Sequence, residues 1–296
     1  MIIRRLAVVL AGVLVLTALS VGPIAARRPS PPTPAPPVER PLSPEEEAAA
    51  QTKAAAAEAY VAARVREGAH LVALSCVTPF GGPAPHEQVT RSTTATCTQP
   101  SRALSVTARD QERGHYCGPA VGQVIANYSW MMAANRNRYS QNQIAEWMRT
   151  NLYGGTSAEY LEDGLEVGTR NAPRRPANWD WVILNLRDTD ADGQFGDQLH
   201  AYVQSNVSGA GMPLAIPVKP HDPDSRYHLA SWPRPVESVG HWIAAYGWYA
   251  YWSNSDTPHI AYTDSSRDEG GSTGKFWDPT RHVAALIREH TGRIVW

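Results

Sequence analysis

The sequence predicts an α+β protein, because helical patterns fill the middle of the chain and strand patterns follow them. Apolar residues recur at intervals of three and four after residue 117, and signals for helix starts occur at residues 140 and 156. Four runs rich in apolar and aromatic residues come after these helices. The chain has 296 residues and 43% apolar content, which is enough for one sizeable domain with appendages.

The first residues have the pattern of an export signal. Arg4 and Arg5 precede an apolar run over residues 6–21, and residues 23–26 offer a cleavage site with small side chains. The apolar run is shorter than the ~20 residues that a membrane-spanning helix needs, and a retained anchor is the alternative. We therefore expect a signal peptide over residues 1–26 and a secreted or extracytoplasmic protein without a transmembrane domain in its mature form.

A proline-rich linker and an alanine-rich helix follow the predicted signal. Residues 27–42 contain many prolines and little apolar content, so they cannot form a core. Ser43 and Glu46 form a capping box around Pro44, which predicts a helix over residues 43–68. We expect this helix to be peripheral or a stalk, because its apolar face is thin. That face consists of Tyr60, Val61 and Val65.

The three cysteines raise the question of which thiol is free. Cys76 and Cys97 flank a loop rich in Thr, Ser, Pro and Gly, whereas Cys117 stands alone. The economical assignment is a Cys76–Cys97 disulfide that pins residues 69–105 and contributes about 3 kcal/mol. A bridge from Cys117 to one of the other two is the alternative, and it would block any chemistry at that thiol. Residues 69–105 either pack on the domain as a hairpin or act as a propeptide.

Capping signals and apolar runs predict the remaining elements. A capping box is a Ser or Thr followed three residues later by Glu or Gln, and two of them lie beyond the cysteine helix. Four strand-like runs and a last helix follow, which completes the α+β order. The predicted features are capping boxes at Ser140/Gln143 and Thr156/Glu159, strands over residues 181–186, 213–218, 241–248 and 260–263, and a helix from an Asp278–Pro279 cap to Ile287.

Cys117 stands at the start of an apolar helical pattern, in the segment Gln-Glu-Arg-Gly-His-Tyr-Cys-Gly-Pro-Ala. We expect Pro119 at the first helical position, where a missing N–H costs nothing. A thiol there faces unpaired backbone N–H groups and the positive end of the helix dipole, which lower the pKa of a cysteine and favour the reactive thiolate. A buried structural cysteine is the alternative. The apolar positions are Val121, Val124, Ile125, Tyr128 and Met132.

Three further residues complete a catalytic pattern with Cys117. Gln111 lies six residues upstream and is expected to donate to an oxyanion, together with the backbone N–H of Cys117. His241 opens a buried strand and would be the general base. Asp264 ends the next strand and would hold the imidazole in one tautomer, with Asp268 as the competing carboxylate. Each of these residue types also occurs at such places for structural reasons alone.

The chain order of the glutamine, cysteine, histidine and aspartate resembles the papain-clan cysteine peptidases. The Cys-Gly-Pro-Ala and Gly-His-Trp motifs and the strand-ending aspartate look most like the bacteriocin-processing (double-glycine leader) peptidases and their secreted, stand-alone relatives. The resemblance implies a papain-like domain over residues 106–296, in which a nucleophile helix and further helices pack on a C-terminal antiparallel sheet that carries His241 and Asp264. It also implies a peptidase that acts on a peptide or protein substrate through a thioester on Cys117.

Two other functions remain as alternatives. An acyl transferase (transglutaminase-like) would use the same Cys-His-Asp site, with an amine in place of water, and the sequence does not distinguish the two acceptors. A non-catalytic binding module of the same fold is the third hypothesis. The presence of all four site residues argues against it, because a binding module has no chemical need for them.

Composition and motifs argue against several other classes of protein. The net charge is −1 and no cluster of Lys or Arg occurs beyond the first residues, which argues against nucleic acid as a partner. No Cys-x-x-Cys pair accompanies His115, Cys117 and His241, so we expect neither a zinc site nor a cofactor.

An acidic stretch after the predicted strand over residues 181–186 matches part of the ligand pattern of an EF-hand loop. Aspartates occupy positions one, three and five, and a glycine occupies position six. Leu199 stands where the bidentate glutamate belongs, so an acidic surface turn is the favoured interpretation and a calcium site the alternative. Asp197 would replace that ligand or cap a helix over residues 198–205. The four aspartates are Asp188, Asp190, Asp192 and Asp197.

Overall fold

The computed structural model describes most of the chain beyond residue 38. The expected signal peptide and most of the expected proline-rich linker lie outside the described residues, and so does the expected Cys76–Cys97 disulfide. Asp188, Asp190 and Asp268 lie outside them as well. The described ranges are 39–68, 101–186, 192–221, 227–234, 239–250, 257–267 and 270–296.

An antiparallel sheet of seven strands forms the centre of the described chain. Its strands are β1 (Ser101–Ala103), β2 (Ile183–Asn185), β3 (Leu214–Val218), β4 (His241–Tyr249), β5 (His259–Asp264), β6 (Gly274–Pro279) and β7 (Arg293–Val295). The order is β2-β7-β3-β4-β5-β6, and β1 pairs with β4. β5 pairs along one edge of β4, and the other edge of β4 is shared by β3 and β1. A β-bulge interrupts the pairing of β4 with β5 between Ala245 and Gly247.

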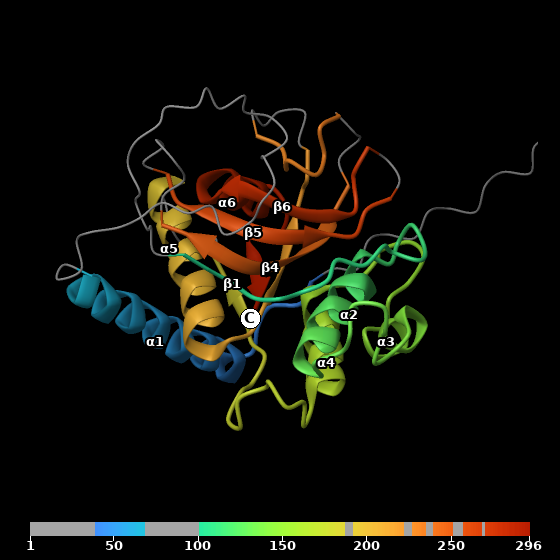
Figure 1. The fold of residues 1–296 in the computed structure, drawn as a ribbon, viewed down its shortest axis with the longest axis horizontal. Helices are drawn as coiled ribbons and strands as arrows, with labels where there is room; N and C mark the ends of the chain where they lie inside the picture. The colour runs from blue at the N-terminus through green and yellow to red at the C-terminus, as the bar shows by residue number, and fades with distance from the viewer. Residues whose placement is uncertain are drawn as a thin grey trace, which may run out of the picture. The chain divides into compact units, whose positions relative to one another are not determined.

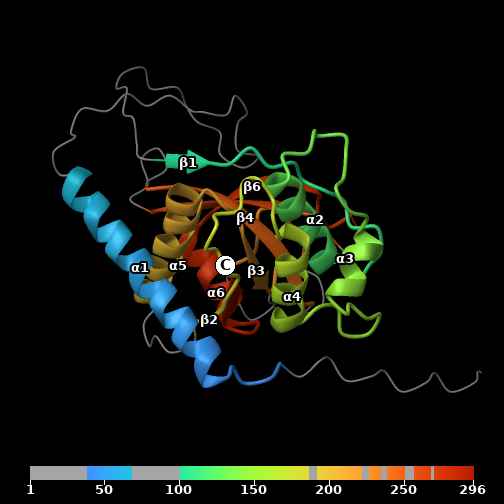
Figure 2. The same ribbon diagram turned by 90° about the horizontal axis from the view of Figure 1, so that it is seen from below.

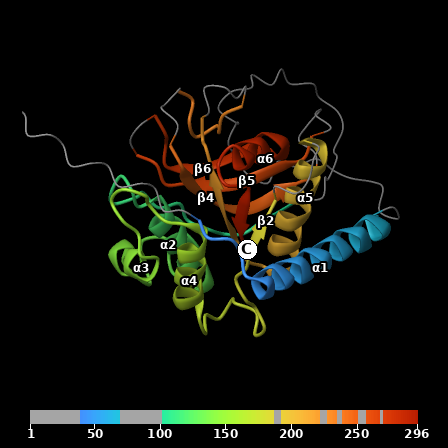
Figure 3. The same cartoon turned by 180° about the vertical axis from the view of Figure 1, so that it is seen from behind.

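Helices lie on both sides of these strands. They are α1 (Pro44–Gly68), α2 (Cys117–Ser129), α3 (Gln141–Trp147), α4 (Ala158–Thr169), α5 (Asp192–Gln204), which continues as the π-helix η1 (Ser205–Ala210), and α6 (Thr280–Arg288). In Figures 1 and 2, α2, α3 and α4 lie to one side of the strands, and α1 and α5 lie to the other. Figure 3 shows the same grouping from behind. Helices around an antiparallel sheet confirm the predicted α+β class.

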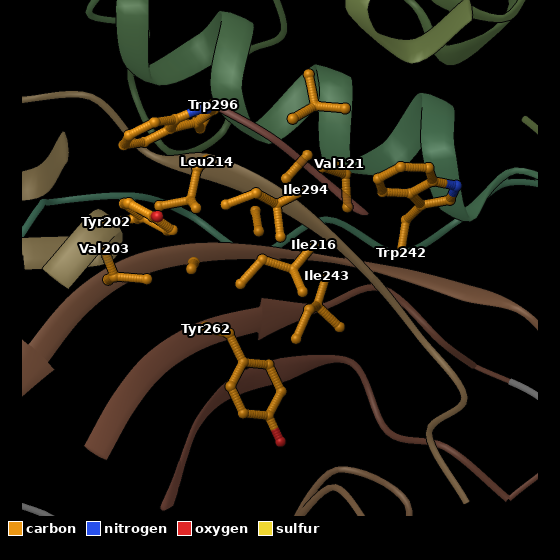
Figure 4. Close-up of a cluster of buried hydrophobic side chains, with 14 of the residues drawn as sticks. Val121, Tyr202, Val203, Leu214, Ile216, Trp242, Ile243, Tyr262, Ile294 and Trp296 are labelled. Atoms are coloured by element: carbon orange, nitrogen blue, oxygen red, sulfur yellow. The ribbon is translucent and has the colours of Figure 1, made fainter. Parts of the chain in front are cut away.

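Apolar side chains fill the layer between the helices and the sheet (Figure 4). Val121 of α2 and Trp242 of β4 lie in this layer with Ile294 and Trp296, whereas Tyr262 of β5 points to the other side of the strands. Successive strand residues point to opposite faces, so one strand serves both layers. Each fully buried side chain of the size of Val or Ile contributes about 1.5–3 kcal/mol to the free energy of unfolding.

The α1 helix packs on the rest of the described chain through small side chains. Ala50, Ala54 and Ala57 are buried along one stripe of the helix. Between them, Lys53 Nζ donates to the backbone carbonyl oxygen of Trp296 at 2.6 Å. Within the described residues, no helix combines the length and the apolar character that crossing a bilayer requires.

Two of the predicted capping boxes are confirmed. Ser43 Oγ accepts from the backbone N–H of Glu46, whose carboxylate accepts from the Ser43 N–H. Ser140 and Gln143 make the same reciprocal pair. These starts depend on residues that are neighbours in the sequence, which is why the sequence alone predicts them.

The box predicted at Thr156 and Glu159 is wrong by one residue. Ser157 caps α4 instead, by accepting a backbone N–H of the first turn at 3.4 Å. Both side chains of the predicted box have other partners. Thr156 Oγ1 lies 2.7 Å from the hydroxyl of Thr150, and Glu159 accepts from Arg293 at 2.8 Å.

Three other helix starts differ from the prediction. α2 begins at Cys117 rather than at Pro119. A proline at the third position is tolerated because the first four N–H groups of a helix have no intrahelical partner. α5 begins at Asp192, so Asp197 lies inside the helix rather than at its cap. Asp278 does not cap α6: it belongs to β6, and its carboxylate accepts hydrogen bonds from other segments.

Thr156 joins α2 to β4. The backbone carbonyl oxygen of Thr156 accepts from the indole N–H of Trp242 at 2.9 Å. Gly118, the second residue of α2, lies against the Thr156 side chain, and a Cβ added at Gly118 would come within 2.5 Å of Oγ1. The first turn of α2 therefore needs a glycine to approach the loop that β4 holds.

We predict that Gly118→Ala destabilises the protein by about 1–3 kcal/mol, because the added methyl group has no room. In an unobstructed helix the same change is stabilising by up to ~1 kcal/mol, so the sign is diagnostic. Gly114→Ala is the matched control, since nothing lies within 4 Å of its added methyl group. Urea unfolding measures both variants, and equal stabilities would contradict the prediction.

Candidate active site

The register of β4 and β5 brings His241 and Asp264 together. His241 is the first residue of β4 and Asp264 the last of β5, so antiparallel pairing puts both at the same end of the sheet. Ala244 pairs with Thr263, so the next pair along is Ile243 with Asp264. Opposed residues share a face of a sheet, and so do residues two apart on one strand. His241 and Asp264 are thus diagonal neighbours, and Nε2 of the imidazole lies 2.8 Å from Oδ1 of the carboxylate.

Four donors surround the carboxylate of Asp264, which is only 1% exposed. Besides the bond with His241, Oδ1 accepts from the backbone N–H of Ser266 at 2.8 Å. Oδ2 accepts from Ser231 Oγ at 2.7 Å and from Trp232 Nε1 at 2.8 Å. The Trp232 ring also packs edge-on against the imidazole, with the two ring centroids 5.2 Å apart. A carboxylate satisfied in this way stays charged inside the protein.

His241 and Asp264 shift each other's pKa. Burial disfavours a charged imidazole, but the charge of Asp264, its hydrogen bond and the Cys117 side chain together raise the pKa of His241 above its usual range. Burial also acts to raise the pKa of Asp264, and it is outweighed by the charge and hydrogen bond of His241 and by two further donors, so that pKa is lowered. The structure therefore favours an imidazolium–carboxylate pair.

Cys117 is the first residue of α2 and carries a free, buried thiol. Its side chain lies close enough to His241 to contribute to the raised pKa of the imidazole. Because Nε2 faces Asp264, Nδ1 is the ring nitrogen available to the thiol. Tyr116 makes no side-chain cap on α2, so backbone N–H groups of the first turn are available next to the thiol. The structure thus brings Cys117, His241 and Asp264 into one group.

Gln111 is tied to the same region through its backbone. Its N–H donates to the carbonyl oxygen of Ser265 at 2.9 Å, which fastens the loop before α2 to the end of β5. The side-chain Nε2 donates to the carbonyl oxygen of Gly114 at 3.0 Å, and the buried Oε1 has no hydrogen-bond partner among the described residues. An amide nitrogen carries two hydrogens, so one remains after the bond to Gly114. The oxyanion role of Gln111 stays a prediction.

Two other residues considered in the sequence have different surroundings. His115 packs edge-on against Tyr116, with ring centroids 4.7 Å apart, and its pKa is lowered by burial and by the charge of Arg113. Asp197 is exposed on α5. No group of three or more His, Cys, Asp or Glu side chains suited to a metal ion occurs in the part of the chain that the structure describes.

A polar cavity of about 460 Å³ lies beside the start of α2. Tyr116, the neighbour of Cys117 in the chain, forms part of its wall, and the Tyr116 hydroxyl donates to Asn142 Oδ1 at 3.1 Å. The guanidinium groups of Arg113 and Arg149 and the carboxylate of Glu146 also line the cavity. Cys117 itself is not part of the cavity wall.

Sequence reasoning missed Ser231 and Trp232, the two side chains that hold Asp264 Oδ2. They lie between β3 and β4, in a stretch without strand or helix periodicity. The single local signal is a tryptophan after a hydroxyl residue shortly before the strand that His241 opens. Such a pair is too common to indicate a partner for a distant aspartate.

Comparisons with known proteins assign no family to the chain. No family model matches it, and no curated protein does. Among solved structures it is similar to a recombinant stem bromelain precursor, with a TM-score of 0.41 and 10% identity over 67% of this chain and 70% of that one. It is also similar to digestive procathepsin L 3 of Tenebrio molitor larval midgut (TM-score 0.40, 13% identity) and to procathepsin L2 from the same source (0.40, 15%). Each of these two matches covers 87% of this chain and 94% of the other.

The pH dependence of stability should reveal the charged pair. The native state keeps a proton on His241 at pH values where the unfolded chain, with a pKa near 6.5, has lost it. The stability contributed by the raised pKa is therefore complete below pH 6.5 and is lost as pH rises through the native pKa. We predict that the stability advantage of the parent over Asp264→Asn is largest at about pH 5 and shrinks steadily towards about pH 9.

Urea unfolding at several pH values measures this advantage. Asp197→Asn, a change at an exposed aspartate of α5, is the control and should show no such trend. An advantage of the parent over Asp264→Asn that does not change between about pH 5 and 9 would mean that no charged pair forms.

Proposed function

We propose that the protein is an exported cysteine hydrolase with a papain-like fold, and most simply a peptidase. One observation carries the proposal: the imidazole of His241 interacts with the Cys117 thiol and with the buried Asp264 carboxylate. Acyl transfer through a thioester uses a nucleophile, a base that takes the proton of the nucleophile, and a group that orients the base. Cys117, His241 and Asp264 would have these three roles. The packing of α2 on β4 supports the papain-like fold. Export is supported by the N-terminal sequence alone.

In the proposed reaction, Nδ1 of His241 holds the proton of Cys117 Sγ, so a thiolate faces an imidazolium before the substrate is attacked. Asp264 accepts from the Nε2–H, which directs Nδ1 towards the sulfur and stabilises the imidazolium. The thiolate attacks the acyl carbon, and the backbone N–H of Cys117 and the remaining N–H of the Gln111 amide stabilise the oxyanion. The imidazolium then protonates the leaving amine. Water, deprotonated by His241, hydrolyses the thioester and releases the thiol.

The surroundings of the pair suit this chemistry. Trp232 packs edge-on against the imidazole and donates to the carboxylate, and both His241 and Asp264 are buried away from water. Charges interact more strongly where water is excluded, which favours the imidazolium when the thiolate forms.

A peptide or protein is the proposed substrate class. The Cys-Gly-Pro-Ala and Gly-His-Trp motifs, which resemble those of the bacteriocin-processing peptidases, support this choice. The polar cavity next to Tyr116 would receive a polar part of such a substrate.

We predict that Cys117→Ala and His241→Ala each lower turnover by at least about a thousandfold, because either change removes a group that bonds to or transfers protons with the substrate. Asp264→Asn should lower it less, by about ten- to a hundredfold, since an amide oxygen still accepts from Nε2–H but carries no charge. Activity is measured on a pool of fluorogenic peptides. Asp163→Asn, an exposed change on α4, is the control.

Labelling with a thiol-reactive acyl probe separates the possible outcomes. Labelling of the parent and not of Cys117→Ala supports the enzyme, whereas a parent that neither reacts nor turns over peptides would be a binding module. Added hydroxylamine distinguishes the two enzymes, because a transferase diverts its thioester to the amine in preference to water. Full turnover by Cys117→Ala would contradict the mechanism.

A further inference from the structure

Two of the four donors to Asp264 come from one short loop, Ala230–Trp232, so whatever fixes this loop also fixes the carboxylate. The loop lies between β3 and β4, and the backbone bonds that hold it are those of a turn, with the Trp232 N–H donating to the Leu229 carbonyl oxygen at 2.8 Å. A second anchor holds its donors more firmly than a turn alone. The structure supplies one on β5 and β6.

The anchor is built from Asp278 and Tyr262. Asp278 is 6% exposed, and its Oδ2 accepts from the backbone N–H of Ala230 at 2.9 Å and from the hydroxyl of Tyr262 at 2.6 Å. Tyr262 is fully buried on β5, two residues before Asp264. Its hydroxyl oxygen lies 3.4 Å from the backbone nitrogen of Ser231 and 3.3 Å from Ser231 Oγ.

The two carboxylates determine the direction of these bonds. The two short contacts join Tyr262 to Asp278 and Ser231 to Asp264, and an ionised carboxylate only accepts. The hydroxyl hydrogens of Tyr262 and Ser231 are therefore committed to the two carboxylates. The Tyr262 oxygen is left to accept the longer bond from the Ser231 N–H. The outcome is an unbroken buried chain of bonds from Asp278 to Asp264.

We propose that Asp278 and Tyr262 are positioning residues, which hold the Ala230–Trp232 loop so that its two donors keep the Asp264 carboxylate aligned with His241. Their effect on turnover rests on the proposed function, but their effect on the imidazole does not. A buried carboxylate is costly unless hydrogen bonds satisfy it, and burial raises the pKa of Asp278 to about 6 despite the bonds from Tyr262 and Ala230. The cost of burying the Asp278 carboxylate is explained if this group holds the loop that orients Asp264.

The test is the titration of His241 itself, followed by NMR of protein labelled with 15N-histidine. Tyr262→Phe removes only the hydroxyl that links the two carboxylates. We expect the pH at which His241 loses its proton to fall by about half a unit to one unit, because a less well held Asp264 stabilises the imidazolium less. Tyr246→Phe, which removes the hydroxyl of a buried tyrosine of β4, is the control and should leave the titration unchanged.

Variants of Asp278, at the other end of the chain of hydrogen bonds, test the proposal if Tyr262→Phe does not fold. Asp278→Leu removes both hydrogen bonds that Asp278 accepts and should lower the midpoint of the His241 titration by a similar amount. Asp278→Asn keeps an oxygen where Ala230 and Tyr262 donate and should restore most of the parent value. Acyl-probe labelling of Cys117 in the parent separately tests the proposed function.

Three results would overturn the proposal. One is a His241 midpoint that stays at the parent value in every Tyr262 and Asp278 variant that folds. Another is an equal fall in Tyr246→Phe, which would show a general response to altered packing. The last is a lower stability of Tyr262→Phe with no change in the His241 titration, since that pattern belongs to a purely structural hydrogen bond.

Discussion

The buried charge of Asp264 is the constraint around which this region is organised. A carboxylate removed from water is tolerated only where donors replace the lost hydration, and here these donors come from four residues. Meeting that requirement fixes the orientation of the His241 ring, the position of Trp232 and the conformation of the loop that carries Trp232. The proposed chemistry thus depends on a charge that the fold must satisfy whether or not a substrate is present.

The proposed nucleophile comes from a different part of the fold than the proposed base and its carboxylate. Cys117 belongs to the group of helices beside the sheet, and His241 and Asp264 belong to neighbouring strands. Thr156 connects the two parts, since its side chain lies against Gly118 and its carbonyl oxygen accepts from Trp242. An error in packing of the helices would therefore move the thiol relative to the imidazole, while the imidazole and carboxylate stayed together.

The sequence predicts what depends on neighbouring residues and fails where distant residues compete. The α+β order, the Ser43 and Ser140 caps and the strands that His241 opens and Asp264 ends all follow from local patterns. Thr156 and Ser157 are both suitable caps, and in the structure Glu159 bonds to Arg293, 134 residues away, instead of closing the predicted box. The sequence did not predict β1, β6 or β7: β1 and β7 have three residues each, and β6 is mostly half-exposed.

The β-bulge in β4 determines which parts of the hairpin can change without affecting the site. Tyr246 is the extra residue, since Ala245 lies opposite Tyr262 and Gly247 lies opposite Ala261. Deleting one residue between His241 and Ala245 would turn the imidazole to the opposite face of the sheet. Added residues beyond Tyr249 leave the paired strands in register. The far end of this hairpin is therefore a site where natural divergence or protein engineering can introduce a new recognition loop and preserve the histidine–aspartate pair.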